Sequence, residues 1–292
     1  MDFQHVDVFA SGPFSGNSLT VFFPTAWPSA AEMLAVTQEF RHFESIFIGP
    51  AADEGPWPAR IFDLEQELPF AGHPVLGAAA ALHSRLGGTA TRSWSIELAA
   101  RTATVHTFFN GRTYSATLDQ GCPEFGPAVT GGAIAAILRG LGLRAADLVP
   151  GLQPAVISTG LTYLLIPVSA EALARAAITV TDFADRLAAA GAQYAYLLDP
   201  ERPEGRHWSN DGRLEDIATG SAAGPAGAYL QRARRRPINV PFILHQGRYA
   251  GRPSRLRVEP RGPADGEVSQ VLVGGDVALV ASGALHGIRV TQ

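Results

Sequence analysis

Cysteine and lysine are almost or wholly missing from this chain of 292 residues. The single cysteine, Cys122, cannot form an internal disulfide or a cysteine metal cluster, and chemistry that needs two thiols is excluded. Lysine does not occur, so all 23 basic residues are arginine. Its absence excludes a Schiff-base nucleophile, a pyridoxal-phosphate lysine and the lysine of a phosphate-binding loop.

Long apolar runs and a strong charge imbalance are also missing. No run of roughly 18 apolar residues occurs, and the first residues lack the pattern of a signal peptide, so we expect a cytoplasmic protein without a membrane partner. A net charge of -4 argues against a nucleic-acid partner. The motifs HExxH, GxSxG and GxGxxG after a strand are absent, as is a zinc-like cysteine–histidine set. We therefore expect neither a metal nor a cofactor.

What the sequence does contain is a repeat. The segments ELPFAGHPVLGAAAALHSRLG and EDIATGSAAGPAGAYLQRARRR lie close to half the chain length apart. In each, acidic residues precede a glycine and a polar residue, Gly72-His73 or Gly220-Ser221, and a run of small residues follows. We interpret this pattern as a degenerate internal duplication. A glycine, an apolar strand, a helix and a second strand precede each segment, at 16–50 and 160–200.

Strands are expected in the rest of each half, because apolar and polar residues alternate there between Gly and Pro turns. A helix of small apolar residues needs burial on all sides. We therefore predict an α+β fold of two pseudo-symmetric domains, each a curved sheet or barrel wrapped around a central apolar helix. The predicted N-terminal domain covers 1–121 together with a closing strand at 280–292, and the C-terminal domain covers 122–279. Segment 122–132 is the expected linker, and 274–290 is an expected hairpin.

A histidine at a helix start is unusual, because Ser, Thr, Asp and Asn are the common capping residues. A helix N-terminus offers unpaired N–H groups and a partial positive charge, and small residues let an anion approach the backbone. We therefore expect His73 and Ser221 to face one another across a shared cleft that binds a carboxylate. The residues leave an alternative open, in which His73 is a structural core histidine and Ser221, Thr219 or Asp216 is an ordinary cap.

The two repeated motifs resemble the phenazine biosynthesis isomerase-like (PhzF) family, which shares the diaminopimelate epimerase fold. ELPFAGHPVLGAA and EDIATGSAAGPAGAYL carry the resemblance, with GNSLTVFF, FESIFI and LHQGRYAGRPSRLRV as further pieces in the family's order. The resemblance covers the chain from end to end. Epimerases and racemases of this fold carry a cysteine at both helix starts. Because His73 and Ser221 stand there in this chain, a two-thiol racemase is excluded.

In the resembled isomerases the acid/base is a glutamate that matches Glu44 of HFESIFI. Apolar neighbours on its strand would exclude water, which suits a group that transfers protons. Without the resemblance, a surface glutamate would be the simpler interpretation. Tyr194 stands near the matching position of the second half, so only one half would carry the acid/base.

The resemblance also implies roles for the residues at the helix starts. Asp216 would hold the amino or hydroxyl group of the substrate and assist the proton relay. The implied catalytic set is Glu44, Asp216 and His73, and the implied carboxylate site consists of Gly72, His73, Gly220 and Ser221.

Two departures from the family pattern lie beside these residues. In EDIATGS, Ile217 stands where the family pattern has a proline. Before Glu44, Arg41 and His42 stand where Asn-Leu is common in the family. The segment EGRHWSNDGRLED is unusually polar. These differences bear on the identity of the substrate more than on the type of reaction.

The leading interpretation is a cofactor-independent isomerase that moves a proton within a small cyclic or dienoic amino acid of secondary metabolism. Its prototype substrate is 2,3-dihydro-3-hydroxyanthranilate. Two alternatives stay open: an epimerase or racemase that uses Glu44 with Asp216 or His73, and a catalytically silent protein that binds small carboxylates. The expected partner is a small anionic amino acid, and the resemblance implies a homodimer.

Overall fold

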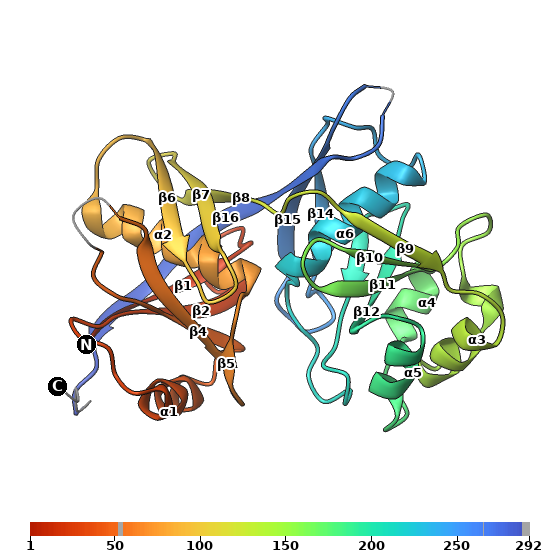
Figure 1. Ribbon diagram of the computed structural model, residues 1–292, viewed down its shortest axis with the longest axis horizontal. Helices are drawn as coiled ribbons and strands as arrows, with labels where there is room; N and C mark the ends of the chain where they lie inside the picture. Colours follow the sequence, from red (N-terminus) through yellow and green to blue (C-terminus); the bar gives the residue numbers. More distant parts are fainter. Residues whose placement is uncertain (52–54, 265, 288–292) are drawn as a thin grey trace. The chain divides into compact units, whose positions relative to one another are not determined.

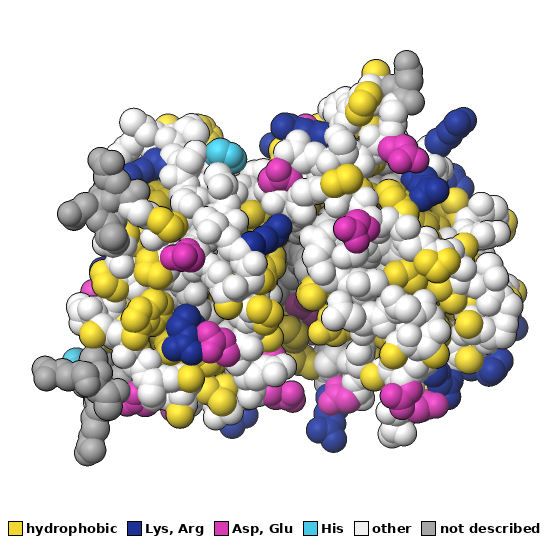
Figure 2. Space-filling model, viewed as in Figure 1, with side chains coloured by type: hydrophobic (Ala, Val, Ile, Leu, Met, Phe, Trp, Pro, Cys, Tyr) yellow, Lys and Arg dark blue, Asp and Glu magenta, His cyan; other side chains and the backbone are white. Residues whose placement is uncertain are grey.

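The computed structural model describes residues 1–51, 55–264 and 266–287. It divides the chain into two compact units (Figure 1). The first unit contains Met1–Asp119 and Gly274–Gln292, and the second contains Gln120–Val273. On the face shown in Figure 2, arginine and acidic side chains are interspersed rather than gathered into one patch of a single sign. Within the described residues, no helix has both the length and the apolar character needed to span a bilayer.

The first unit is a closed barrel around one helix, α2 (Gly72–Leu86). This helix contacts β1, β2, β3, β6, β7 and β8, and all its residues from Gly72 to His83 are buried. Burial on every side explains why the helix lacks a polar face. The strands pair in the order β1 (Asp2–Val8), β2 (Asn17–Phe23), β3 (Glu44–Ile48), β4 (Trp57–Asp63), β6 (Thr91–Glu97), β7 (Thr102–Phe109), β8 (Tyr114–Asp119) and β16 (Gln270–Ala284), which returns to β1; β5 (Glu67–Leu68) pairs with β4.

Helix α1 (Ala30–Phe40) covers the outer face of this barrel. It begins at a capping box, in which the Ser29 side chain accepts a bond from the Glu32 N–H and the Glu32 carboxylate accepts one from the Ser29 N–H. It ends at Arg41, whose φ of 56° is left-handed. The helix and the outer strand faces share an apolar cluster that consists of Phe22, Met33, Phe47 and Phe62.

The second unit repeats this strand order around helix α6 (Gly220–Arg232). Strands β11 and β12 are parallel like β2 and β3, and β13 and β14 are parallel like β4 and β6. In both halves, the helix rich in small residues lies in the chain between the two strands of the second parallel pair. This helix is α2 between β4 and β6, and α6 between β13 and β14. The duplication expected from the sequence is therefore present in the topology. The strands, in pairing order from β16, are β15 (Ser254–Arg261), β14 (Phe242–Gln246), β13 (Glu204–Arg206), β12 (Tyr194–Asp199), β11 (Thr162–Pro167), β10 (Ala155–Ser158) and β9 (Glu124–Ala128).

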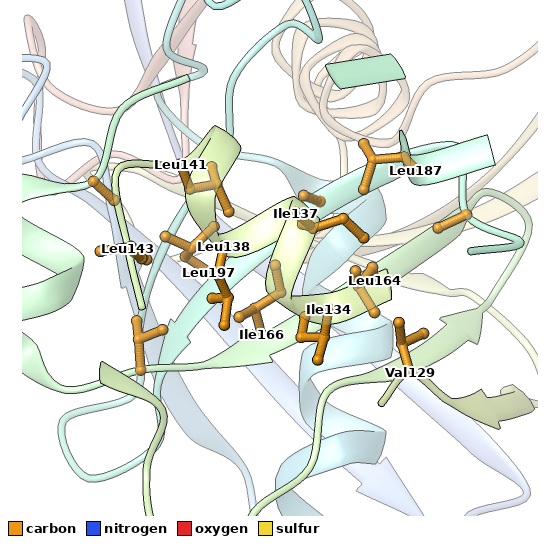
Figure 3. Close-up of a cluster of buried hydrophobic side chains, with 14 of the residues drawn as sticks. Val129, Ile134, Ile137, Leu138, Leu141, Leu143, Leu164, Ile166, Leu187 and Leu197 are labelled. Carbon is orange, nitrogen blue, oxygen red and sulfur yellow. The ribbon is translucent and has the colours of Figure 1, made fainter. Parts of the chain in front are cut away.

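A separate apolar core lies between β11, β12 and the outer helices α3 (Gly131–Gly140), α4 (Ala170–Arg175) and α5 (Phe183–Ala189). Figure 3 shows Ile134, Ile137 and Leu138 of α3 against Leu164, Ile166 and Leu197 of the two strands. Each fully buried aliphatic side chain contributes about 1.5–3 kcal/mol. Because side chains alternate along a strand, Tyr163 and Leu165 of β11 point to the opposite face, toward α6.

Two expectations about the connections are wrong. Segment 122–132 is not a linker, because β9 lies within it and pairs with β10. Proline is tolerated in β9 because this strand stands at the end of the pairing order of the sheet. Segment 274–290 is not a hairpin, because β16 continues as one strand to Ala284. The last residues of the predicted closing strand, 288–292, lie outside the described residues.

The glycines of β16 allow close packing instead of a turn. A Cβ atom on Gly274 would lie 2.4 Å from the Ala116 carbonyl oxygen, and one on Gly283 would lie 2.8 Å from the Phe3 ring. A side chain at Gly274 would clash with backbone, and one at Gly283 would have to displace the Phe3 ring, so glycine lets β16 pass close to its neighbours.

Candidate active site

Glu44 and His73 form a buried pair inside the first unit. Glu44 is the first residue of β3, where it lies opposite Leu19 of the parallel strand β2. His73 is the second residue of α2. Glu44 Oε2 lies 2.9 Å from His73 Nδ1, and the two residues are 8% and 5% exposed. The structure therefore brings together two residues of the predicted catalytic set, and Glu44 is not a surface residue.

The geometry places one hydrogen between the two side chains. When Glu44 is a carboxylate its oxygen can only accept, so Nδ1 of His73 then carries the shared hydrogen. The other ring nitrogen, Nε2, is buried and has no hydrogen-bond partner among the described residues. An unpaired buried polar atom costs about 1–3 kcal/mol, and a native structure retains one only for a reason. Nε2 therefore has hydrogen-bonding capacity that the described residues do not use.

The start of α2 leaves backbone donors available near this pair. The N-cap residue, Ala71, has no side chain that could accept a hydrogen bond from the first turn. The positive end of the helix dipole therefore lies at Gly72 and His73 without a capping group. Close packing holds the helix in place, because a Cβ atom on Gly77 would lie 2.4 Å from the Leu19 side chain.

In the second unit, Ser221 at the start of α6 pairs with a tyrosine. Ser221 Oγ lies 2.7 Å from the hydroxyl of Tyr163 in β11. Tyr163 lies opposite Tyr194 of the parallel strand β12, in the same arrangement as Leu19 and Glu44. Tyr194 thus occupies the position of Glu44. The residue that contacts Ser221 at the start of α6 is instead Tyr163, which lies on the neighbouring strand β11.

Asp216 is buried, 6% exposed, and is held rigidly before α6. Its Oδ2 accepts a bond of 2.7 Å from the Thr219 hydroxyl, and its Oδ1 accepts one from the Ala218 N–H. Gln246 Nε2 donates to the Thr219 hydroxyl oxygen at 2.9 Å and to the Asp216 carbonyl. Gln246 Oε1 in turn accepts from the hydroxyl of Tyr196. This network fixes the orientation of the Asp216 carboxylate.

The polar segment noted in the sequence is a hairpin that carries Asp216 and His207. Arg206 donates two hydrogen bonds to the Glu215 carboxylate, of 2.9 and 2.7 Å, and its guanidinium stacks on the ring of Trp208 at 4.4 Å. The N–H of Asp216 donates to the carbonyl of His207 at 3.0 Å. The unusual polarity of this segment therefore includes a structural ion pair, and it does not by itself indicate a ligand.

The departures at Arg41 and His42 lie away from Glu44. The left-handed turn at Arg41 places His42 Nδ1 3.0 Å from Ser18 Oγ, and the His42 ring lies 4.5 Å from that of His5. Ser18 and Leu19 point to opposite faces of β2, and Leu19 points toward α2. His42 thus lies on the outer face of the sheet, whereas Glu44 points inward.

Several polar residues around these sites were missed from the sequence. Tyr163 and Gln246 lie within strands, where a buried polar residue in an apolar run was the only available signal. Gln120 donates to the Gly220 carbonyl at 2.8 Å, and His207 lies beside Asp216. Their partners are distant in the sequence, so no local motif marks them.

The structure thus places the predicted residues in two groups, one per unit. Glu44, His73 and Gly72 lie together in the first, and Asp216, Gly220 and Ser221 lie at the start of α6 in the second. That His73 and Ser221 share one cleft stays a prediction. In the parts of the chain that the structure describes, no group of three or more His, Cys, Asp or Glu side chains could hold a metal ion.

Comparisons with known proteins identify the family. The model of the phenazine biosynthesis-like protein family matches residues 6–283. The chain is 32% identical over 291 residues to the trans-2,3-dihydro-3-hydroxyanthranilate isomerase of Pseudomonas aeruginosa, with 95% of this chain and 96% of the relative covered. It is also 32% identical over 265 residues to the uncharacterized isomerase YddE of Escherichia coli O157:H7, with 87% and 88% covered.

A solved structure supports the same assignment. The predicted epimerase PA4716 of Pseudomonas aeruginosa superposes with a TM-score of 0.91 at 44% identity, over 98% of this chain and 99% of that one. This match confirms the predicted epimerase-like α+β fold of two similar halves. The chain belongs to the phenazine biosynthesis-like protein family, and it is an enzyme of the isomerase class.

Proposed function

We propose that the chain isomerises a small cyclic or dienoic amino acid of the 2,3-dihydro-3-hydroxyanthranilate type without a cofactor, in a secondary-metabolite pathway. The observation that carries the proposal is the Glu44–His73 pair, a buried carboxylate held by a histidine whose Nε2 has no hydrogen-bond partner among the described residues. The relative named as an isomerase of this substrate supports the substrate class.

The reaction conserves atoms and electrons. The Glu44 carboxylate takes a proton from one ring carbon, and the electron pair of the broken C–H bond shifts into the conjugated system next to the substrate carboxylate. Glu44 then returns the proton to another carbon, where a new C–H bond forms. A single acid/base is sufficient for this shift. In D₂O the proton on Glu44 exchanges with solvent before it is returned, so the product carries deuterium at the new C–H bond.

His73 orients the Glu44 carboxylate through Nδ1 and acts on the substrate through Nε2. When the imidazole is protonated, Nε2–H donates to the substrate carboxylate at the positive end of α2. The Gly72 backbone contributes there, because it carries no side chain that would block an anion.

The second unit supplies the remaining contacts in this proposal. Asp216 binds the amino or hydroxyl group of the substrate and assists the proton relay. Ser221 and the Gly220 backbone hold the carboxylate, and Tyr163 orients the Ser221 hydroxyl.

An epimerase or racemase that uses Glu44 with Asp216 or His73 is the second candidate, and the two halves do not supply it with a symmetric pair of bases. Tyr194 stands at the position of Glu44, and Ser221 stands at the position of His73. The second base of an epimerase would therefore have to be Asp216 or His73 and not a residue at the position that corresponds to Glu44. A homodimer and a cytoplasmic location stay predictions, and light scattering on the purified protein tests the first.

Proton NMR in D₂O tests the function. The wild type, Glu44→Gln and the control Glu39→Gln are incubated with 2,3-dihydro-3-hydroxyanthranilate and a panel of cyclic amino acids. Glu39 is an exposed glutamate of α1 in the same unit. We expect carbon-bound deuterium and a change in ultraviolet absorbance with wild type and Glu39→Gln, and neither with Glu44→Gln.

The labelled position separates the two candidates, because an epimerase exchanges one α-proton and leaves the absorbance unchanged. Equal exchange by Glu44→Gln would remove Glu44 from the mechanism. Binding without exchange by the wild type would favour the catalytically silent carboxylate-binding protein.

A further inference from the structure

An aromatic cluster reaches the start of α6 through Tyr163 and contains a histidine to which no role has been assigned. The ring of His207 lies 5.7 Å from that of Tyr163 and 5.6 Å from that of Tyr194, and both ring pairs are edge-on. His207 follows β13 directly and is 7% exposed. Since the Tyr163 hydroxyl contacts Ser221, this cluster lies beside the residues proposed to bind the substrate.

The tautomer of His207 is set by a backbone carbonyl. Nδ1 lies 2.9 Å from the oxygen of Ala195, and a carbonyl only accepts hydrogen bonds, so Nδ1 carries the hydrogen. Burial lowers the pKa of His207, although the negative charge of Asp216 opposes this shift. The imidazole is therefore neutral at neutral pH, and Nε2 presents a lone pair.

This lone pair is not used within the described chain. No hydrogen bond joins Nε2 of His207 to another described residue, whereas Nδ1 is fully paired. Asp216, the other acceptor, is joined to His207 through the backbone and lies close enough to influence its charge. The hairpin therefore carries two acceptor side chains: His207, which lies beside the ring of Tyr163, and Asp216, whose oxygens also accept from Thr219 and Ala218.

We propose that His207 Nε2 accepts a hydrogen bond from the amino group of the substrate and selects amino acids over simple carboxylic acids. The assignment deepens the proposed function and rests on it for the identity of the substrate. Paired acceptors and donors suit a molecule that carries an amine next to a carboxylate. The edge-on rings of Tyr163 and Tyr194 hold the imidazole plane, so the direction of the lone pair is fixed.

Two stable aromatic probes test the selection. Calorimetry measures the binding of 3-hydroxyanthranilate, which has the amine, and of 3-hydroxybenzoate, which lacks it. The proteins are wild type, His207→Asn and the control His245→Gln, since His245 is an exposed histidine of the same unit. The asparagine amide can still donate to the Ala195 carbonyl, but it places no acceptor at the position of Nε2.

We expect wild type and His245→Gln to prefer 3-hydroxyanthranilate by about tenfold, the usual contribution of one hydrogen bond. His207→Asn should lose this preference and keep its affinity for 3-hydroxybenzoate. Equal wild-type affinities for the two probes, or no wild-type binding of 3-hydroxyanthranilate, would overturn the assignment. An unchanged preference in His207→Asn would show that His207 is only structural.

A measurement on the wild type covers the case in which His207→Asn does not fold. In ¹⁵N-histidine-labelled protein, the Nε2 resonance of His207 should show an unprotonated nitrogen that moves toward the hydrogen-bonded range with 3-hydroxyanthranilate alone. A resonance that does not respond would contradict the assignment. Both experiments measure binding, so they fail independently of the deuterium exchange that tests the proposed function.

Discussion

Glu44 and Tyr194 occupy the same place in the two halves of the fold. Each is the first residue of a strand that runs parallel to its neighbour, and Glu44 lies opposite Leu19 as Tyr194 lies opposite Tyr163. The duplicated frame therefore positions an acid/base in one half and an aromatic side chain in the other. This asymmetry is expected of an enzyme that returns a proton to a different carbon with one base.

His73→Phe should destabilise the protein by about 3 kcal/mol, because it leaves the Glu44 carboxylate buried without its partner. Adding Glu44→Gln should recover part of this loss, since an unpaired amide costs less than an unpaired charge. Urea unfolding of both single variants and the double variant measures the coupling. Additive losses would mean that the two side chains do not interact in the folded protein.

Tyr163→Phe should raise KM by about fivefold to tenfold and change kcat little. The substitution removes the hydroxyl that lies 2.7 Å from Ser221 Oγ but keeps the ring. Tyr229→Phe is the matched control, because the Tyr229 hydroxyl donates to the Gln153 carbonyl in the same unit and takes no part in the proposed site. A loss confined to kcat would instead place Tyr163 in the proton transfer.

Acidification should destabilise the wild type through His207. Burial lowers the pKa of His207 in the folded protein, so between this pKa and about 6.5 the unfolded chain binds a proton that the folded chain does not. Stability should fall as the pH decreases below about 6.5, by up to roughly 1.4 kcal/mol for each pH unit. Urea unfolding of wild type and His207→Gln across this range isolates the effect. Parallel curves for the two proteins would contradict it.

Gly77→Ala should cost about 1–3 kcal/mol, because the new methyl group would lie 2.4 Å from Leu19 Cδ2 and 3.0 Å from Val8 Cγ2. Gly132→Ala in α3 is the control, since nothing lies within 4 Å of a Cβ atom there and alanine favours helices. Thermal unfolding compares the two variants. Equal melting temperatures would show that the packing around α2 can adjust.

Much of the fold could be predicted because burial leaves a local pattern. The helices that begin at Gly72 and Gly220 are rich in small residues and lack a polar face, so they were predicted to be buried at the centre of each half. Their repeated flanking segments indicated two similar halves. The glycines of β16 were misinterpreted, because a glycine that permits a turn and one that permits close approach look alike in a sequence. The same ambiguity made the edge strand β9 look like a linker.

The amino-acid sequence by itself determined the kinds of residue at the helix starts, the excluded chemistries and the duplicated order of elements, since composition and periodicity are properties of the chain alone. Only the tertiary structure decided which side chains meet. The Glu44–His73 contact depends on how α2 packs against β3. The Tyr163–Ser221 contact depends on the register of β11. The tautomer of His207 depends on the Ala195 carbonyl of the neighbouring strand β12. These relationships join residues far apart in the chain, so only packing brings them within hydrogen-bonding distance.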